Sequence, residues 1–151
     1  MNFDEDNILL GVDVMDKSEL FHFIAEYAKK IGITDDSQKL IDAFEDREKE
    51  VSTGLQDSFA IPHAKSKYIK KPIVLYLKLQ HPIEWETFDD SPVQNVFALL
   101  VPSKSAGTLH LEMISRIATS LLEEEFTKTV KNSSNVNELK SVITEAMKGD
   151  N

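Results

Sequence analysis

Cysteine is absent from the 151-residue sequence, and its absence removes several kinds of chemistry at once. The chain has no disulfide, no thiolate metal ligand and no cysteine nucleophile. No apolar run approaches the roughly 18 residues that a membrane helix needs. The opening residues, MNFDEDNILL, also lack the basic stretch of a secretory signal. We therefore expect a soluble protein that works in the cytoplasm.

Positive charge is scarce as well, since 17 Lys and Arg residues stand against 26 Asp and Glu, a net charge of −9. Nucleic-acid binding is disfavoured, because phosphate contacts need a basic face and the one dense basic stretch is residues 65–71. The acidity has two explanations that the sequence leaves open: it steers a basic protein partner, or it only keeps the protein in solution. No metal-ligand spacing and no GxxxxGK[ST] nucleotide loop is present, so we expect neither a metal nor a cofactor.

Short apolar runs and amphipathic segments are intermixed along the whole chain. The predicted strands cover residues 8–14, 59–61, 73–79 and 94–102. The predicted helices cover residues 19–31, 36 or 37 to 51, 109–124 and 136–147. The run 94–102 is nearly all apolar, which is typical of a central strand buried on both faces. The pattern predicts one domain, residues 1–151, folded as a three-layer α/β/α sandwich around a small mixed sheet.

Several end points of these elements follow from single residues. Ser18 and Asn135 are candidate helix caps, Gly32 is a helix stop, and His81-Pro82 reads as a turn. The apolar residues expected to face inward from the helix 109–124 are Leu111, Ile114, Ile117, Ala118, Leu121 and Leu122.

Four histidines are the natural place to look for chemistry, because imidazole is nucleophilic and titrates near neutral pH. His22, beside two phenylalanines in the first helix, reads as a residue of the helix surface or core edge. His81 reads as a solvated turn residue.

His63 differs from these two because it follows a short strand and Pro62, whose ring fixes φ near about −65°. The end of a strand holds a side chain rigidly at an edge that partners can reach. His110 opens the long helix after Gly107-Thr108, where free backbone N–H groups suit a phosphate. For both His63 and His110 the sequence leaves open that the residue has no role in chemistry and is only part of the fold. Arg47, in the charged run 46–50, would ordinarily belong to a solvated helix face.

Taken together, these residues resemble one family. The segment Arg47-Glu48-x-x-x-Ser52-Thr53-Gly54, followed by Phe59-Ala60-Ile61-Pro62-His63-Ala64-Lys65, resembles the phosphorylation-site region of the fructose/mannitol-type enzyme IIA of the bacterial phosphotransferase system. Ile83-Glu84-Trp85, residues 92–97, Val101-Pro102 and the block from Leu109-His110-Leu111 to Leu122 fit the same family. The match covers nearly the whole chain.

The sequence departs from the family pattern in two places. The family usually has Gly-x-Gly shortly before its Ala-Ile-Pro-His, whereas this chain has Gln56-Asp57-Ser58. Phe59 stands where an aliphatic residue is usual. Glycine permits unusual backbone angles, so these departures concern the conformation of the loop and its fit to partners.

The resemblance implies a set of roles. His63 would take phosphate from the phosphohistidine of HPr and pass it to a cognate enzyme IIB, commonly to a cysteine. His110 would hydrogen-bond the imidazole or the phosphoryl oxygens, and Arg47 would balance the phosphate charge with its fork of donors. The membrane enters only indirectly, through the transporter.

The resemblance leaves three functions open. The first is a phosphocarrier for sugar uptake, with the fructose-like branch favoured by Ala64-Lys65 and Ile83-Glu84-Trp85. The second is a nitrogen-type regulatory enzyme IIA, which uses the same histidine but acts on other partners. The third is a binding domain that kept the fold and lost the chemistry.

Overall fold

The computed structural model describes residues 3–104 and 108–148, with only the backbone for residues 108–110. A short 3-10 turn, Glu5–Asn7, opens the chain. The strands are β1 (Ile8–Val12), β2 (Phe59–Ala60), β3 (His63–Ser66), β4 (Ile73–Ile83) and β5 (Val93–Pro102). The helices are α1 (Lys17–Lys30), α2 (Ser37–Glu50), α3 (Thr108–Ser120), α4 (Glu124–Asn132) and α5 (Val136–Lys148). Among the described residues, no helix combines the length and apolarity that crossing a membrane requires.

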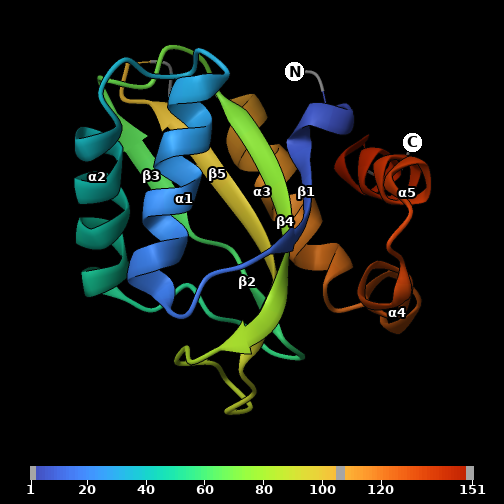
Figure 1. The fold of residues 1–151 in the computed structure, drawn as a ribbon. Helices are drawn as coiled ribbons and strands as arrows, with labels where there is room; N and C mark the ends of the chain where they lie inside the picture. The colour runs from blue at the N-terminus through green and yellow to red at the C-terminus, as the bar shows by residue number, and fades with distance from the viewer. Residues whose placement is uncertain (1–2, 105–107, 149–151) are drawn as a thin grey trace.

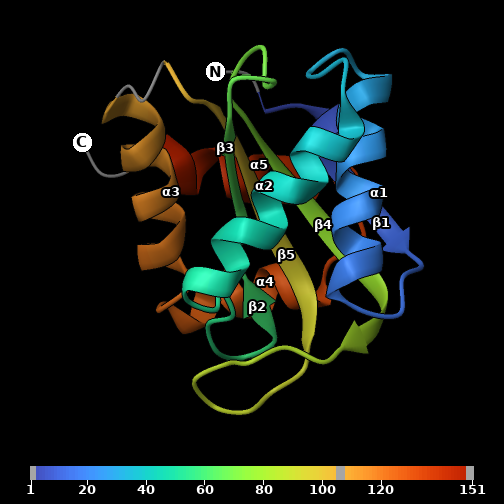
Figure 2. The same ribbon diagram turned by 90° about the vertical axis from the view of Figure 1, so that its left-hand side faces the viewer.

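The predicted three-layer α/β/α sandwich is confirmed (Figure 1). α1 and α2 cover one face of the sheet, and α3, α4 and α5 cover the other (Figures 1 and 2). The sheet runs β1-β4-β5-β2, and β3 also pairs with β5. β4 and β5 are antiparallel, whereas the other pairings are parallel, so the sheet is mixed as expected.

β5 is the central strand that its apolar sequence predicted, with residues 95–100 all buried. Side chains of the sheet alternate between two separate cores, because successive residues of a strand point to opposite faces. Under α1 and α2, Phe21 stacks on Phe44 with ring centroids 5.1 Å apart. On the other face Tyr76 packs against Phe97 and donates its hydroxyl to Asn95 at 2.7 Å.

The helix ends test the capping predictions. Asn135 caps α5 through the Glu138 N–H, as expected, and Asp36 caps α2 by accepting from the Lys39 N–H. The prediction for Ser18 is wrong: α1 begins one residue earlier, at Lys17, and Asp16 accepts the capping bond from the Glu19 N–H. A carboxylate is as good a cap as a hydroxyl, and its charge suits the helix N-terminus.

Three further predictions need correction. His81 and Pro82 are not a turn but belong to β4, where an irregular register between Lys78 and Ile83 accommodates the proline. The single helix predicted over 109–124 ends at Ser120, and a separate helix, α4, follows it. Leu122 lies beyond this end and is 77% exposed; Leu111, inside α3, is also exposed, at 59%, so neither faces inward as predicted, whereas Ile114, Ile117 and Leu121 are buried.

Candidate functional site

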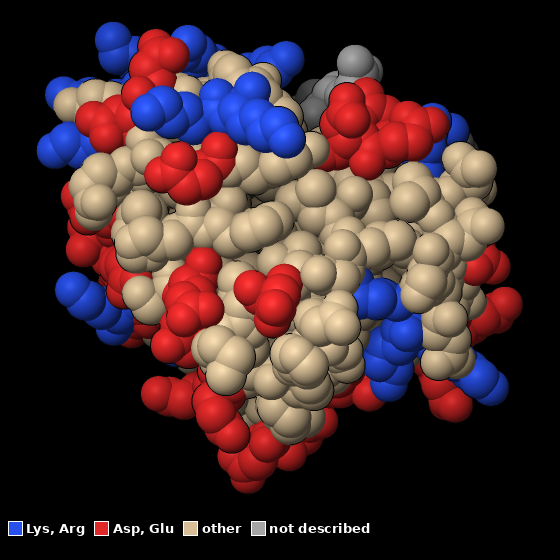
Figure 3. Space-filling view, in the orientation of Figure 1, with Lys and Arg blue, Asp and Glu red and all other residues tan. Residues whose placement is uncertain are grey.

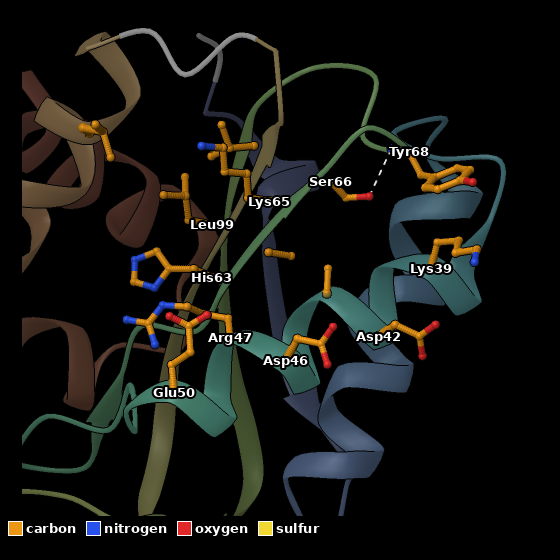
Figure 4. Close-up of a pocket in the computed structure, with 14 residues that line it drawn as sticks. Lys39, Asp42, Asp46, Arg47, Glu50, His63, Lys65, Ser66, Tyr68 and Leu99 are labelled. Carbon is orange, nitrogen blue, oxygen red and sulfur yellow. Dashed lines mark hydrogen bonds between the residues drawn. The ribbon is translucent and has the colours of Figure 1, made fainter.

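A groove of about 730 Å³ lies between α2 and β3. Side chains from four elements line it (Figure 4). They include Asp42, Asp46, Arg47 and Glu50 of α2, His63 and Lys65 of β3, Leu99 and Val101 of β5, and Leu111 of α3. Figure 2 shows β3 between α2 and α3, and residues of all three elements line the groove.

His63 sits at this groove because of a break in the chain at Pro62. β2 and β3 both run parallel to β5, and the residues between them, Ile61 and Pro62, interrupt the ladder because proline has no N–H to donate. Instead the Pro62 carbonyl accepts from the Leu99 N–H at 2.9 Å. His63 is thus the first residue of β3, paired with Leu99, rather than a residue just beyond a strand end as predicted.

The imidazole of His63 is held in its neutral form. The ring is half-buried, and its Nδ1 is buried without a hydrogen-bond partner in the described part of the chain. Burial, and after it the Arg47 guanidinium, lowers the pKa of His63 to about 4, while the Glu48 carboxylate opposes both effects. At neutral pH the ring is therefore uncharged, and its unprotonated nitrogen can act as a nucleophile.

Arg47 lies beside His63, although the charged run around it suggested an ordinary solvated face. It occupies the last turn of α2, and one terminal nitrogen donates to the Val51 carbonyl at 2.9 Å. Figure 4 shows the guanidinium next to the imidazole, at the same end of the groove. A guanidinium in this place can receive an anionic group carried by the ring.

The other histidines separate into two cases. His110 falls in the first turn of α3, but its side chain lies outside the described residues; the next residue, Leu111, lines the groove. His22 and His81 are both exposed and do not line the groove. His22 places Nδ1 2.9 Å from the Ser18 carbonyl, and His81 places Nε2 4.0 Å from Asp13, so both are surface residues as expected.

Charge is unevenly distributed around this site despite the net charge of −9. Asp42, Asp46 and Glu50, spaced by four residues on α2, bring three carboxylates to the groove. At the end of the groove away from His63, the Nζ atoms of Lys39 and Lys67 lie 5.8 and 5.4 Å from the centroid of the Tyr68 ring. Figure 3 shows Lys and Arg side chains gathered at the end of the molecule where the α1–α2 and β3–β4 loops lie. No group of three or more His, Asp or Glu in the described ranges is arranged to hold a metal ion.

One group of residues near the site was not predicted to interact. Glu48, the neighbour of Arg47, accepts hydrogen bonds from Thr53 and from the Trp85 indole. All three lie in motif segments of the sequence. Glu48 and Thr53 are only five residues apart at the end of a helix, so the sequence could have predicted their contact. Nothing in the sequence indicated Trp85 as a partner of Glu48.

Comparison with known proteins gives a match over almost the whole chain. The family model described as "Phosphoenolpyruvate-dependent sugar phosphotransferase system, EIIA 2" matches residues 1–146. The chain is 33% identical over 137 residues to the nitrogen regulatory protein of Klebsiella oxytoca, covering 89% of this chain and 83% of that protein. It is 30% identical over 131 residues to the fructose-specific EIIABC component of Mycoplasma pneumoniae, covering 87% of this chain but only 19% of that longer protein.

Solved structures show the same fold. The nitrogen regulatory protein IIA-Ntr from Neisseria meningitidis superposes with a TM-score of 0.82 at 25% identity, covering 92% of this chain and 94% of that one. The mannitol enzyme IIA of Escherichia coli, solved in complex with phosphorylated enzyme IIB, gives a TM-score of 0.79 at 20% identity, covering 95% of this chain and 98% of that one.

Proposed function

Because the chain belongs to the EIIA type 2 family of the phosphoenolpyruvate-dependent sugar phosphotransferase system, whose members are phosphotransfer proteins, we propose that it carries a phosphoryl group on His63. The observation that carries the proposal is a neutral imidazole at a groove, with a guanidinium beside it. His63 accepts the group from a phosphorylated protein donor and yields it to a protein acceptor.

The buried Nδ1 suggests which ring nitrogen reacts. A buried atom cannot reach a donor, so Nε2 is the proposed nucleophile, with the ring proton on Nδ1. The Nε2 lone pair forms the new N–P bond while the donor's N–P bond breaks, and the donor ring keeps that electron pair. The two rings exchange states, so charge and atoms balance.

Arg47 and His110 are the proposed partners of this step. Arg47 meets the negative charge of the phosphoryl oxygens, a role that its place beside the ring supports. His110, at the start of α3, hydrogen-bonds the His63 imidazole or the phosphoryl group, as the resemblance implies. Both act by position and charge, because phosphoryl transfer needs little other chemistry from the protein.

The proposed donor is HPr, and the proposed acceptor is an enzyme IIB of a sugar transporter, with the fructose-like branch favoured. The complex solved for the mannitol relative supports an enzyme IIB as the acceptor. On this proposal residues 1–151 act as one domain in the cytoplasm. A nitrogen-type regulatory role is the second candidate, favoured by the 33% identity and the 0.82 TM-score to proteins of that name.

Loss of the chemistry, the third possibility, finds less support in the loop before His63. Ser58, which replaces a usual glycine, has φ 72°, and Asp57 has φ 57°. The loop thus keeps a left-handed backbone of the kind that glycine favours, although the glycine itself is missing.

Phosphate uptake tests the proposal directly. Incubation with phosphorylated HPr should place one acid-labile, base-stable phosphate on each chain, and His63→Ala should take up none. Uptake by His63→Ala would refute the assignment. Adding a fructose-type enzyme IIB then separates the two candidate roles, because the transport protein should phosphorylate it and the regulatory protein should not.

A further inference from the structure

Three motif residues that take no direct part in the proposed phosphoryl transfer are bonded to one another. One carboxylate oxygen of Glu48, Oε2, accepts from the Thr53 backbone N–H and from the Trp85 indole N–H, each at 3.0 Å. The other, Oε1, accepts from the Thr53 hydroxyl at 2.6 Å. The Glu48 side chain is 8% exposed, and Lys17 lies 3.8 Å from Oε2. This carboxylate is therefore buried and paired, and both of its oxygens accept hydrogen bonds.

A further hydrogen bond connects these residues to the segment just before His63. Thr53 is itself buried, and its carbonyl accepts from the Ile61 N–H at 3.0 Å, two residues before His63. Gly54 and Ala60 form an antiparallel bridge beside this bond. The segment also presses closely on residues 85–86, since a Cβ added to Gly54 would lie 2.3 Å from the Glu86 carbonyl oxygen.

Arg47 and Glu48 hold the same short segment from adjacent positions of α2. Arg47 donates to the Val51 carbonyl, and Glu48 accepts from Thr53. The end of α2 is therefore tied to residues 51–53, and these residues are tied to the strand that delivers His63. Movement of residue 53 would change the position of the imidazole relative to the guanidinium.

We propose that Glu48 is a positioning residue of the site: its carboxylate fixes Thr53, and Thr53 fixes the Ile61–His63 segment in front of Arg47. Its consequence for phosphoryl transfer rests on the proposed function. The charge of Glu48 has a second effect, because it raises the pKa of His63 against burial and Arg47, which lower it.

Two variants separate geometry from charge. Glu48→Gln keeps the length of the side chain: its oxygen can accept from the two N–H groups, and its amide can donate to the Thr53 hydroxyl. It therefore removes mainly the charge. Thr53→Val keeps the charge of Glu48 and the backbone N–H but removes the hydroxyl. Glu45→Gln, one turn earlier on α2, is the matched control, since no described hydrogen bond joins Glu45 to residues 51–54.

The readouts are the His63 pKa, followed by NMR of the imidazole, and the rate of phosphate uptake from phosphorylated HPr. We expect Glu48→Gln to shift the His63 pKa downward relative to both wild type and Glu45→Gln. Thr53→Val should slow uptake by roughly tenfold or more, and Thr53→Ser should restore it. Thermal unfolding checks that each variant is folded; if Thr53→Val is not, the uptake of Glu48→Ala, which removes both acceptor oxygens, is compared with that of Glu45→Ala.

Wild-type uptake by folded Thr53→Val would overturn the positioning role. An equal His63 pKa in Glu48→Gln and Glu45→Gln would overturn the effect of the Glu48 charge on the imidazole. Failure of the proposed function is a different result, because wild-type protein would then take up no phosphate. The pKa comparison would still decide whether the Glu48 charge acts on His63 in that case, since it requires no phosphorylation.

Discussion

Lys131, near the end of α4, places its Nζ 2.5 Å from Oδ1 of Asp57, in the turn that precedes β2 and His63. The contact joins residues 74 positions apart in the sequence. It ties the helical layer on one face of the sheet to the loop in which the sequence departs from its family. Asp57 is held from a second side, because its N–H donates to the Asp89 carboxylate at 2.9 Å.

The Lys131–Asp57 pair should contribute little to stability despite its short distance. The two side chains are 34% and 44% exposed, so water screens their attraction. A double-mutant cycle with Lys131→Gln and Asp57→Asn should give a coupling of about 0.2–1 kcal/mol in urea unfolding, smaller at high salt. A coupling several times larger that resists salt would show that the pair acts as a buried one.

Ser58 has a left-handed backbone conformation, in which any residue other than glycine is strained. Its φ of 72° is left-handed, and the strain is offset by hydrogen bonds from its N–H to Ser91 and from the Gln94 N–H to its hydroxyl. Ser58→Ala and Ser58→Gly both lose the hydroxyl and differ in one methyl group. We expect Ser58→Gly to be the more stable by about 1 kcal/mol in urea unfolding. Equal stabilities would contradict the left-handed conformation.

Arg47→Ala should slow phosphate uptake by roughly 10²- to 10³-fold, the usual effect of removing one donor from developing charge. The same change should raise the pKa of His63, because Arg47 lowers it. Arg47→Lys should fall between wild type and Arg47→Ala, since it keeps the charge and loses the fork of donors.

Arg116→Ala is the control for Arg47, because Arg116 instead donates to carbonyls at the end of α5. Its uptake rate should equal that of wild type. An Arg47→Ala protein with unchanged uptake would remove Arg47 from the site.

The stability of the fold should depend on pH through His63. Its pKa is about 4 when folded, chiefly because the ring is buried and then because of Arg47, against 6.5 as a reference. Between these values the unfolded chain binds the proton more readily, so stability falls as the pH is lowered from 6.5 to 4. Above pH 6.5 the effect vanishes, because both states are neutral.

The size of this loss should reach about 3 kcal/mol at pH 4, as a shift of more than two pKa units implies. The comparison is with His63→Gln, which cannot bind the proton, in urea unfolding at a series of pH values. Parallel curves for the two proteins would show that His63 titrates normally in the folded state.

Much of the fold followed from local patterns. The apolar run at 94–102 predicted the central strand, Asp36 and Asn135 predicted helix starts, and Pro62 predicted a break before His63. The failures were also local in origin. β3 is too short and polar to show a pattern, and the helical period of 109–124 runs on past the true end of α3 at Ser120.

The sequence by itself determined the elements and the chemical candidates, because caps, periodicity and proline act over a few residues and histidine is reactive wherever it stands. The tertiary structure alone decided which candidates meet. Arg47 reaches His63, Glu48 reaches Trp85 and Lys131 reaches Asp57 only after α2 and α4 have packed on the sheet. Those contacts depend on strand pairing and layer packing between distant segments, and burial, the main cause that lowers the His63 pKa, exists only in the folded state.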